Sequence, residues 1–428
     1  MGVYLTEEEE RMFEGEYGPG VQKAMRILTS LGDVMGAEKM IRVAGSHIVP
    51  LSAYFFGDTA KYSRDFEMEL TEGAERFRVL ATINPRCIDL RYAEKLGLSK
   101  SLMEAVQESM EWGIKRFEEL GVIPTWTCTP FFVHVTRKGE HLGGAESVAV
   151  TMYNSMYGAM VNRETTPTAL ATALTGRTPL FGMHIPENRY GQVLVEVGDD
   201  LDPREFTNAD YSAFSYYTGK VVMDRSPVFT GFPSDTTITQ LKHLCAPLGV
   251  SGAVSLAHIV GVTPEAPTAE AAFLGRKPEE KIIVGKRELN RTYGDLCTAT
   301  EEKVDAVVFG CPNATVEEIK GIVELLKGKK IHDGVRLLIG TPEPLRILAE
   351  RMGLTDVVES AGGLVVSDMC PTVAVGILGP EIGVHVVASN CSKCAHYTTA
   401  FSSGKVKAWF GGARQCINAA MTGKWGGE

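Results

Sequence analysis

The sequence predicts an α/β protein with mostly parallel sheets, divided into three domains. Apolar residues make up 44% of the chain and charged residues 22%, which is typical of a protein that buries a large core. Short apolar runs alternate with helical patterns in the C-terminal third, as in sheets covered by helices on both faces. A length of 428 residues suggests roughly three domains. We place them at residues 1–175, 176–285 and 286–428.

The first domain is predicted to contain three helices and two strands. Thr6 and Glu9 form a capping box, which opens the first helix. A second helix is expected to end at Gly32, because glycine often follows the last helical residue. The second and third helices are expected over 21–31 and 101–120, and the strands over 40–44 and 122–128.

The C-terminal third has the clearest alternation of strands and helices. Thr315 and Glu318 form another capping box, which opens a helix to about residue 326, and a further helix starts near Pro342. Ligands of parallel sheets bind beyond the carboxyl ends of the strands, so the residues that follow these strands are candidates for a site. The strands are expected over 305–310, 335–340, 364–367 and 383–389.

Charge and hydropathy exclude several classes of partner. The 53 acidic residues exceed the 43 basic ones by 10, and a surface of that sign repels nucleic acid. No apolar stretch reaches the roughly 18 residues that a membrane helix needs. Four consecutive glutamates, residues 7–10, have the wrong sign for a secretion signal or transit peptide. We therefore expect a cytosolic protein without membrane or nucleic-acid partners.

Four of the nine cysteines are expected at or just beyond strand ends: Cys128, Cys311, Cys370 and Cys391. Any one of them alone is more often a packed thiol than a functional one. Four in equivalent positions favour a metal or catalytic site, because cysteines in a reducing compartment seldom form disulfides. A thiolate at Cys311 would also be favoured by the capped helix that follows it.

Other cysteine chemistry stays open. Cys391 and Cys394 form the only C-x-x-C, which could bind metal, act as a redox pair or have no special role. A zinc site would need a second such pair, and the chain has none. Glycine-rich nucleotide loops and a G-x-S-x-G nucleophile turn are also missing, which argues against dehydrogenases, P-loop enzymes and serine hydrolases.

Several segments together resemble the aconitase X family, in its separate large-subunit form, over nearly the whole chain. The resemblance is carried by GSHIVPLSAY at 45–54, TINP at 82–85, TCTPFF at 127–132, GGAESVAVTMYNSMYGAMVNRE at 143–164, GRTPLFGMHIPENR at 176–189, FGCP at 309–312, GGLVVSDMC at 362–370 and NCSKCAHY at 390–397. It implies an aconitase-like fold of three α/β domains around a central cleft.

The resemblance implies a hydro-lyase that removes water from a hydroxylated carboxylic acid. The leading substrate is mevalonate 5-phosphate, dehydrated to trans-anhydromevalonate 5-phosphate in an archaeal mevalonate route to isoprenoids. The alternative is cis-3-hydroxy-L-proline or another hydroxy acid. An iron–sulfur cluster is implied, in a four-iron form first, with a two-iron cluster or a single iron as alternatives. By motif its ligands are Cys128, Cys311 and Cys370.

Three thiolate ligands suit this chemistry better than four. An iron with an open coordination position can bind the substrate hydroxyl and act as a Lewis acid. In the aconitase superfamily the base that removes the proton is a serine on a swivelling domain, and we find no such domain in this sequence. The resemblance therefore implies a separate small subunit that completes the site as a heterodimer.

Further roles carry over by motif. His47 could orient the hydroxyl or move its proton, and Lys393 could meet a carboxylate or phosphate as a point charge. The catalytic set implied by the resemblance is His47, Lys393 and Ser147. The implied substrate-binding set is Pro50, Leu51, Ser52, Asn84, Pro85, Glu146, Ser147 and Lys393.

The chain departs from the family pattern around the expected pocket. Pro50 stands where glycine is usual, which restricts φ and removes an N–H donor. The other departures are Gly45, Val148, Asn313, Met369 and Cys391, the last replacing a serine. They motivate a hypothesis of another class, a non-catalytic iron-binding protein, with a structural zinc protein as a third option.

Overall fold

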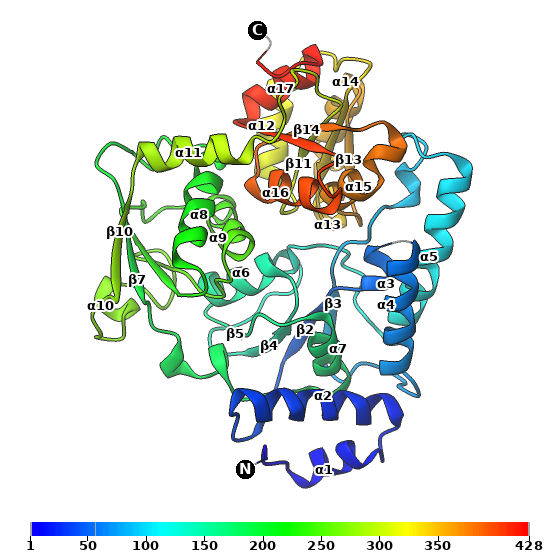
Figure 1. Ribbon diagram of the computed structural model, residues 1–428, viewed down its shortest axis with the longest axis vertical. Coiled ribbons are helices and arrows are strands. Elements are labelled where there is room, and N and C mark those ends of the chain that lie inside the picture. The colour runs from blue at the N-terminus through cyan, green and yellow to red at the C-terminus, as the bar shows by residue number, and fades with distance from the viewer. Residues whose placement is uncertain (1, 56, 427–428) are drawn as a thin grey trace. The chain divides into compact units, whose positions relative to one another are not determined.

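The computed structural model describes residues 2–55 and 57–426, which fold into two compact units (Figure 1). Unit 1 comprises residues 1–86, 101–190 and 263–265, and unit 2 comprises residues 87–100, 191–262 and 266–428. The described chain contains three parallel sheets, of four, four and five strands, and a two-stranded antiparallel pair. The predicted α/β class is therefore confirmed, whereas the exact domain boundaries stay a prediction.

Unit 1 is built on a four-stranded sheet whose strands are all parallel. Its strands are β2 (Gly45–Ile48), β3 (Leu80–Ile83), β4 (His141–Gly144) and β5 (Met160–Val161), in the order β3-β2-β4-β5. The antiparallel pair is β1 (Met40–Arg42) with β6 (Arg177–Pro179). The helices are α1 (Glu7–Glu14), α2 (Pro19–Met35), α3 (Leu51–Tyr54), α4 (Gly57–Leu70), α5 (Lys100–Glu119), α6 (Ser147–Tyr157) and α7 (Thr166–Thr175).

Of the two helix boundaries that capping residues predicted in this unit, one is confirmed and one is wrong. The Glu9 carboxylate accepts the amide of Thr6 at 2.9 Å, which confirms the capping box of α1. The prediction that α2 ends at Gly32 is wrong, because the helix continues to Gly36, whose φ of +70° ends it. Gly32 is instead a packing position, since a Cβ there would lie 2.6 Å from a methyl group of Val3.

The predicted strand over residues 122–128 is also wrong. Only Ile123 pairs with the sheet, in an isolated bridge to Thr82. Pro124 offers no amide to a neighbouring strand, and Trp126 has a φ of +39°. Cys128 therefore follows an irregular segment and not a strand.

Unit 2 contains the other two parallel sheets. The first has the order β10-β7-β8-β9 and lay outside the predicted elements. Its strands are β7 (Val193–Val197), β8 (Pro227–Thr230), β9 (His258–Ile259) and β10 (Glu280–Val284), and its helices are α8 (Asn208–Val222), α9 (Ile238–Ser251), α10 (Ala269–Ala272) and α11 (Lys286–Leu296).

The five-stranded sheet confirms all four strands predicted for the C-terminal third. Its order is β13-β12-β11-β14-β15, and the sequence analysis missed only its edge strand β15. The strands are β11 (Ala306–Phe309), β12 (Arg336–Gly340), β13 (Leu364–Val366), β14 (Val386–Ser389) and β15 (Lys407–Phe410). The helices are α12 (Val316–Leu326), α13 (Glu343–Arg351), α14 (Leu354–Ala361), α15 (Pro371–Leu378), α16 (Ser392–Phe401) and α17 (Ala413–Thr422).

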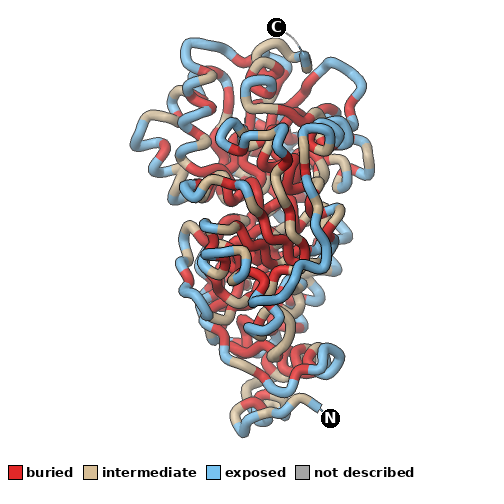
Figure 2. The backbone as a smooth tube through the Cα atoms, turned by 90° about the vertical axis from the view of Figure 1, so that its left-hand side faces the viewer, coloured by how far each residue is buried: buried red, intermediate tan, exposed pale blue. Residues whose placement is uncertain are grey.

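Helices cover both faces of this sheet, as Figure 1 shows. Apolar side chains of α12, α13, α14 and α17 pack with alternate strand residues, including Val307, Phe309 and Ile339, in one buried cluster. The helices α15 and α16 pack together and contact β12 and β14 respectively. Every residue of β11 and β14 is buried, and Figure 2 shows buried backbone in the interior with exposed segments around it. No described helix is both long and apolar enough to cross a membrane.

Candidate active site

The carboxyl ends of the unit 1 strands bring two of the predicted site residues, His47 and Asn84, together. His47 lies on the central strand β2, where it is paired with Thr82 of β3 on one side and Gly144 of β4 on the other. Asn84 directly follows β3, and its backbone amide donates to the backbone carbonyl oxygen of Ile48 at 2.8 Å. All three parallel strands thus end at one edge, as expected for a ligand site in such a sheet.

His47 is held as a neutral imidazole in this environment. Burial lowers the pKa of its ring to about 4, although Glu146 and Asn84 act in the opposite direction. Its Nδ1 lies 2.9 Å from the hydroxyl oxygen of Thr82. Its Nε2 and the Oδ1 of Asn84 are both buried, and no hydrogen bond of good geometry among the described residues uses either atom, although the Asn84 side chain lies close enough to raise the pKa of the ring. Buried polar atoms usually have well-placed partners, so these two neighbouring atoms are the candidates for contacts with a small polar ligand.

Glu146 and Ser147 form the start of helix α6, directly after β4. The Glu146 carboxylate accepts the amide of Ala149 at 2.7 Å and so acts as the N-cap of the helix. The Ser147 hydroxyl donates to the same carboxylate at 3.2 Å. Glu146 therefore has a structural role in α6 besides any contact with a substrate.

The predicted substrate loop, residues 50–52, directly precedes and begins helix α3. Pro50 is the N-cap residue, with a φ of −80° that proline adopts without strain. Ser52 is wholly buried, and both its amide and its hydroxyl face the carboxylate of Glu67 on α4. The sequence analysis did not identify Glu67, because nothing in the local pattern links α4 to this loop.

Unit 2 places three of the singled-out cysteines at one edge of the five-stranded sheet. Cys311 follows β11, Cys370 follows β13 and Cys391 follows β14, so all three lie beyond the carboxyl ends of parallel strands. The Cys391 thiol donates to the carbonyl oxygen of Cys311. The pKa of the Cys311 thiol is raised by its hydrogen bond with Cys391, by burial and by the nearby thiols of Cys394 and Cys370.

The C-x-x-C pair lies at the beginning of helix α16. Cys391 is its N-cap residue and Cys394 lies in its first turn, directly after strand β14. Lys393 lies between them and is buried, with its ammonium nitrogen 5.9 Å from the centre of the Tyr397 ring. A redox pair would require this position at a helix start, so the placement leaves that alternative open.

A buried charge network supports the loop that follows Cys311. The ammonium group of Lys242, on α9, donates to the carbonyl oxygens of Pro312 at 3.3 Å and Asn313 at 2.8 Å, and to the Glu318 carboxylate. The Nε2 of His243 lies 2.6 Å from the other oxygen of that carboxylate. Burial alone would raise the pKa of Glu318, but Lys242 and His243 outweigh it and hold the pKa well below its ordinary value.

The three predicted iron ligands come from both units. Cys128 belongs to unit 1, whereas Cys311 and Cys370 belong to unit 2. Within each unit, no three described histidine, cysteine, aspartate or glutamate side chains are grouped so that they could hold a metal ion. The donor set itself fits an iron–sulfur cluster, because thiolates are the ligands that such clusters take from proteins. The ligand set stays a prediction.

Family models identify the chain from end to end. The models described as the first, second and third domains of aconitase X match residues 2–187, 191–294 and 304–422. The chain therefore belongs to the aconitase X family. A crystal structure of Thermococcus kodakaraensis aconitase X in its holo-form is similar with a TM-score of 0.84 and 31% identity, over 98% of this chain and all of that one.

The similar curated proteins are dehydratases, which are hydro-lyases. The phosphomevalonate dehydratase large subunit of Methanothermobacter thermautotrophicus is 35% identical over 92% of this chain and 94% of its own. The cis-3-hydroxy-L-proline dehydratase of Pseudomonas aeruginosa is 30% identical over 99% of this chain and 71% of its own.

Proposed function

We propose that this chain is the large subunit of an iron–sulfur-dependent hydro-lyase that dehydrates mevalonate 5-phosphate to trans-anhydromevalonate 5-phosphate. One observation carries the proposal. At the carboxyl edge of the unit 1 sheet, the buried Nε2 of His47 and Oδ1 of Asn84 form no hydrogen bond of good geometry with other described residues, so a substrate could contact both. The similarity to phosphomevalonate dehydratase large subunits, at 35% identity over almost the full length of both chains, supports the substrate.

The residues of unit 1 would bind and orient the substrate. The neutral Nε2 of His47 can accept a hydrogen bond from the substrate hydroxyl or donate one to it, depending on the tautomer. Asn84 would contact the same part of the substrate through its Oδ1, which forms no hydrogen bond of good geometry with another described residue. Glu146 lies close enough to raise the pKa of the His47 ring and so to favour its protonated form. Lys393, which belongs to unit 2, would supply positive charge to a carboxylate or phosphate.

The cofactor would be held by Cys128, Cys311 and Cys370. When bound, an iron–sulfur cluster with an open coordination position supplies a Lewis acid that assists departure of the hydroxide. The reaction removes one proton and one hydroxide and leaves a carbon–carbon double bond and a water molecule. The proton must be taken from the carbon next to the carboxylate, which requires a well-placed base.

We further propose that a small subunit carries this base. The relatives from Methanothermobacter thermautotrophicus and Methanocaldococcus jannaschii are named as large subunits. This chain covers 94% and 97% of their lengths. The large subunit alone is therefore expected to bind iron and to turn over poorly.

The test is a dehydration assay with both candidate substrates. Anaerobically reconstituted chain, mixed with its small partner, is incubated with mevalonate 5-phosphate or with cis-3-hydroxy-L-proline, and the products are followed by proton NMR. We expect a new olefinic signal with mevalonate 5-phosphate. Turnover of cis-3-hydroxy-L-proline alone would favour the second candidate, which the 30% identical relative supports. Iron binding without turnover of any hydroxy acid would favour the non-catalytic hypothesis.

A further inference from the structure

The short helix α3 leaves two amides without a partner inside the helix. The amides of Ala53 and Tyr54 donate to the carbonyl oxygen of Pro50 at 3.0 and 2.8 Å. Those of Leu51 and Ser52 come too early in the helix to find such an acceptor. Both donate to the carboxylate of Glu67, 15 residues further along the chain, and so does the Ser52 hydroxyl. The Glu67 carboxylate thus accepts hydrogen bonds from both backbone amides that have no acceptor inside α3.

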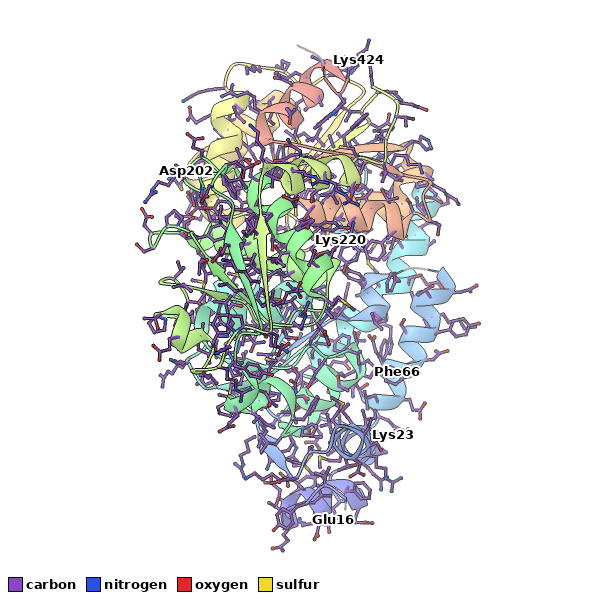
Figure 3. All side chains as sticks on the ribbon, turned by 60° about the vertical axis from the view of Figure 1, so that its left-hand side comes forward. Glu16, Lys23, Phe66, Asp202, Lys220 and Lys424 are labelled. Carbon is purple, nitrogen blue, oxygen red and sulfur yellow. The ribbon has the colours of Figure 1, made fainter. Side chains whose placement is uncertain are left out.

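Glu67 lies on the inward face of α4. It is wholly buried, whereas its neighbours Phe66 and Glu69 are exposed, and Figure 3 shows Phe66 pointing away from the unit. A buried carboxylate is costly unless it is hydrogen-bonded. Burial raises the pKa of Glu67 to about 7, and its hydrogen bonds from Ser52 and Leu51 oppose that shift. The donors of α3 are therefore what keeps this carboxylate in the core.

The surrounding helices leave Ser52 in a single position. Gly113 of α5 lies against it, and a Cβ at residue 113 would come within 2.2 Å of the Ser52 hydroxyl oxygen. The end of α4 is fixed by Arg116 of α5, which donates to the carbonyl oxygens of Thr71 at 2.6 Å and Ala74 at 2.9 Å. The loop is thus held between two helices, and Glu67 supplies a carboxylate partner to its buried residue Ser52.

We propose that Glu67 is a positioning residue for the substrate loop: its carboxylate binds the amino end of α3 and holds residues 50–54 in one conformation at the edge of the unit 1 sheet. The proposal rests on the proposed function, in which this loop contacts the substrate. Glu67 does not itself touch the substrate, because its oxygens are occupied by Leu51 and Ser52. It fixes where Pro50 and the backbone of α3 lie.

The first measurement requires no substrate. Hydrogen–deuterium exchange of the full chain is compared between wild type, Glu67→Gln and the control Glu69→Gln, which removes an exposed carboxylate of the same helix that pairs with Lys23 at 3.1 Å. The exchange is measured at pH 8, where Glu67, with a pKa of about 7, is ionised. A hydrogen bond to a charged group stabilises its donor enough that we expect exchange at 51–54 to rise about tenfold in Glu67→Gln. The control should leave exchange at 51–54 unchanged.

The second measurement uses the reconstituted complex with its small partner. For a loop that positions substrate, Glu67→Gln should raise KM about tenfold and change kcat less than about twofold. A purely structural role would instead lower the amount of folded enzyme and leave KM unaltered. Ser52→Ala removes the hydroxyl from the other side of the same contact and serves as the second variant if Glu67→Gln does not fold.

The outcomes separate the two proposals. Unchanged exchange at 51–54 in both Glu67→Gln and Ser52→Ala would overturn the positioning role, whatever the enzyme's substrate is. Faster exchange with an unchanged KM would overturn it as well, because the loop would then be held by Glu67 without affecting substrate binding. If wild type dehydrates neither substrate, the proposed function fails, and faster exchange would still establish that Glu67 holds the loop.

Discussion

The ammonium group of Lys242 and the carboxylate of Glu318 form an ion pair in which the lysine side chain is wholly buried. Glu318 lies in the first turn of helix α12, and its carboxylate also accepts the backbone amide of Thr315 at 2.8 Å. The ammonium group also donates hydrogen bonds to the carbonyl oxygens of Pro312 and Asn313, the two residues that follow Cys311. One ion pair therefore connects α9, the beginning of α12 and the loop of a predicted iron ligand.

Removing one partner of this pair should be strongly destabilising. Lys242→Met leaves the Glu318 carboxylate buried with only His243 to neutralise it, so we expect a loss of about 3–5 kcal/mol in the free energy of unfolding. Lys220→Met is the matched control, because Lys220 is half exposed (Figure 3) and its pairing with Asp295 at 3.5 Å should contribute at most about 1 kcal/mol. Urea denaturation measures both, and equal midpoints for the two variants would contradict the prediction.

His47 should remain neutral far below the usual pH range of histidine. With its pKa lowered to about 4, the folded chain binds no proton at His47 between pH 6.5 and 4, whereas the unfolded chain does. Stability should therefore fall as the pH falls through this window, by about 3 kcal/mol in total. Ring-proton NMR titration gives the pKa directly, and His47→Gln should remove this part of the pH dependence. A titration midpoint near pH 6.5 for the His47 ring would show that burial does not lower its pKa, and it would contradict this prediction.

The predicted iron ligands can be tested one at a time. Cys128→Ser, Cys311→Ser and Cys370→Ser should each lower the iron and sulfide bound per chain after anaerobic reconstitution, because a serine hydroxyl is a poor ligand for iron in such clusters. Cys297→Ser is the control, since Cys297 is half-buried and its thiol donates to the carbonyl oxygen of Phe410 at 3.6 Å. Full iron content in any of the three variants would exclude that residue as a ligand.

Cys391→Ser should behave differently from those three variants. The serine hydroxyl can still donate to the carbonyl oxygen of Cys311, which is the contact that the Cys391 thiol makes. We therefore expect unchanged iron content and an unchanged visible absorption spectrum. Loss of iron comparable to that of Cys311→Ser would instead identify Cys391 as a further ligand of the metal.

Most of the five-stranded sheet in unit 2 could be predicted from local patterns, whereas the four-stranded sheet of the same unit was not. A buried β-branched run such as Ala306–Phe309 forms a strand in nearly any setting that covers both of its faces. The capping box of Thr315 and Glu318 is local too, since its atoms are three residues apart. The segment around Ile123 looked equally apolar, but Pro124 and the backbone of Trp126 prevent a strand there.

The sequence by itself determined the α/β class, the strands of the C-terminal sheet and the polar and thiol-bearing residues that follow the strands. Only the tertiary structure decided which of them are held by distant side chains. Ser52 and Glu67 are 15 residues apart, and Lys242 and Glu318 are 76 apart. No local spacing pattern in the sequence reveals such pairs, because each residue is compatible with its own segment and its partner is far away in the chain. A charged side chain that is buried needs a hydrogen-bonding or charged partner, and these side chains become buried only when the helices pack.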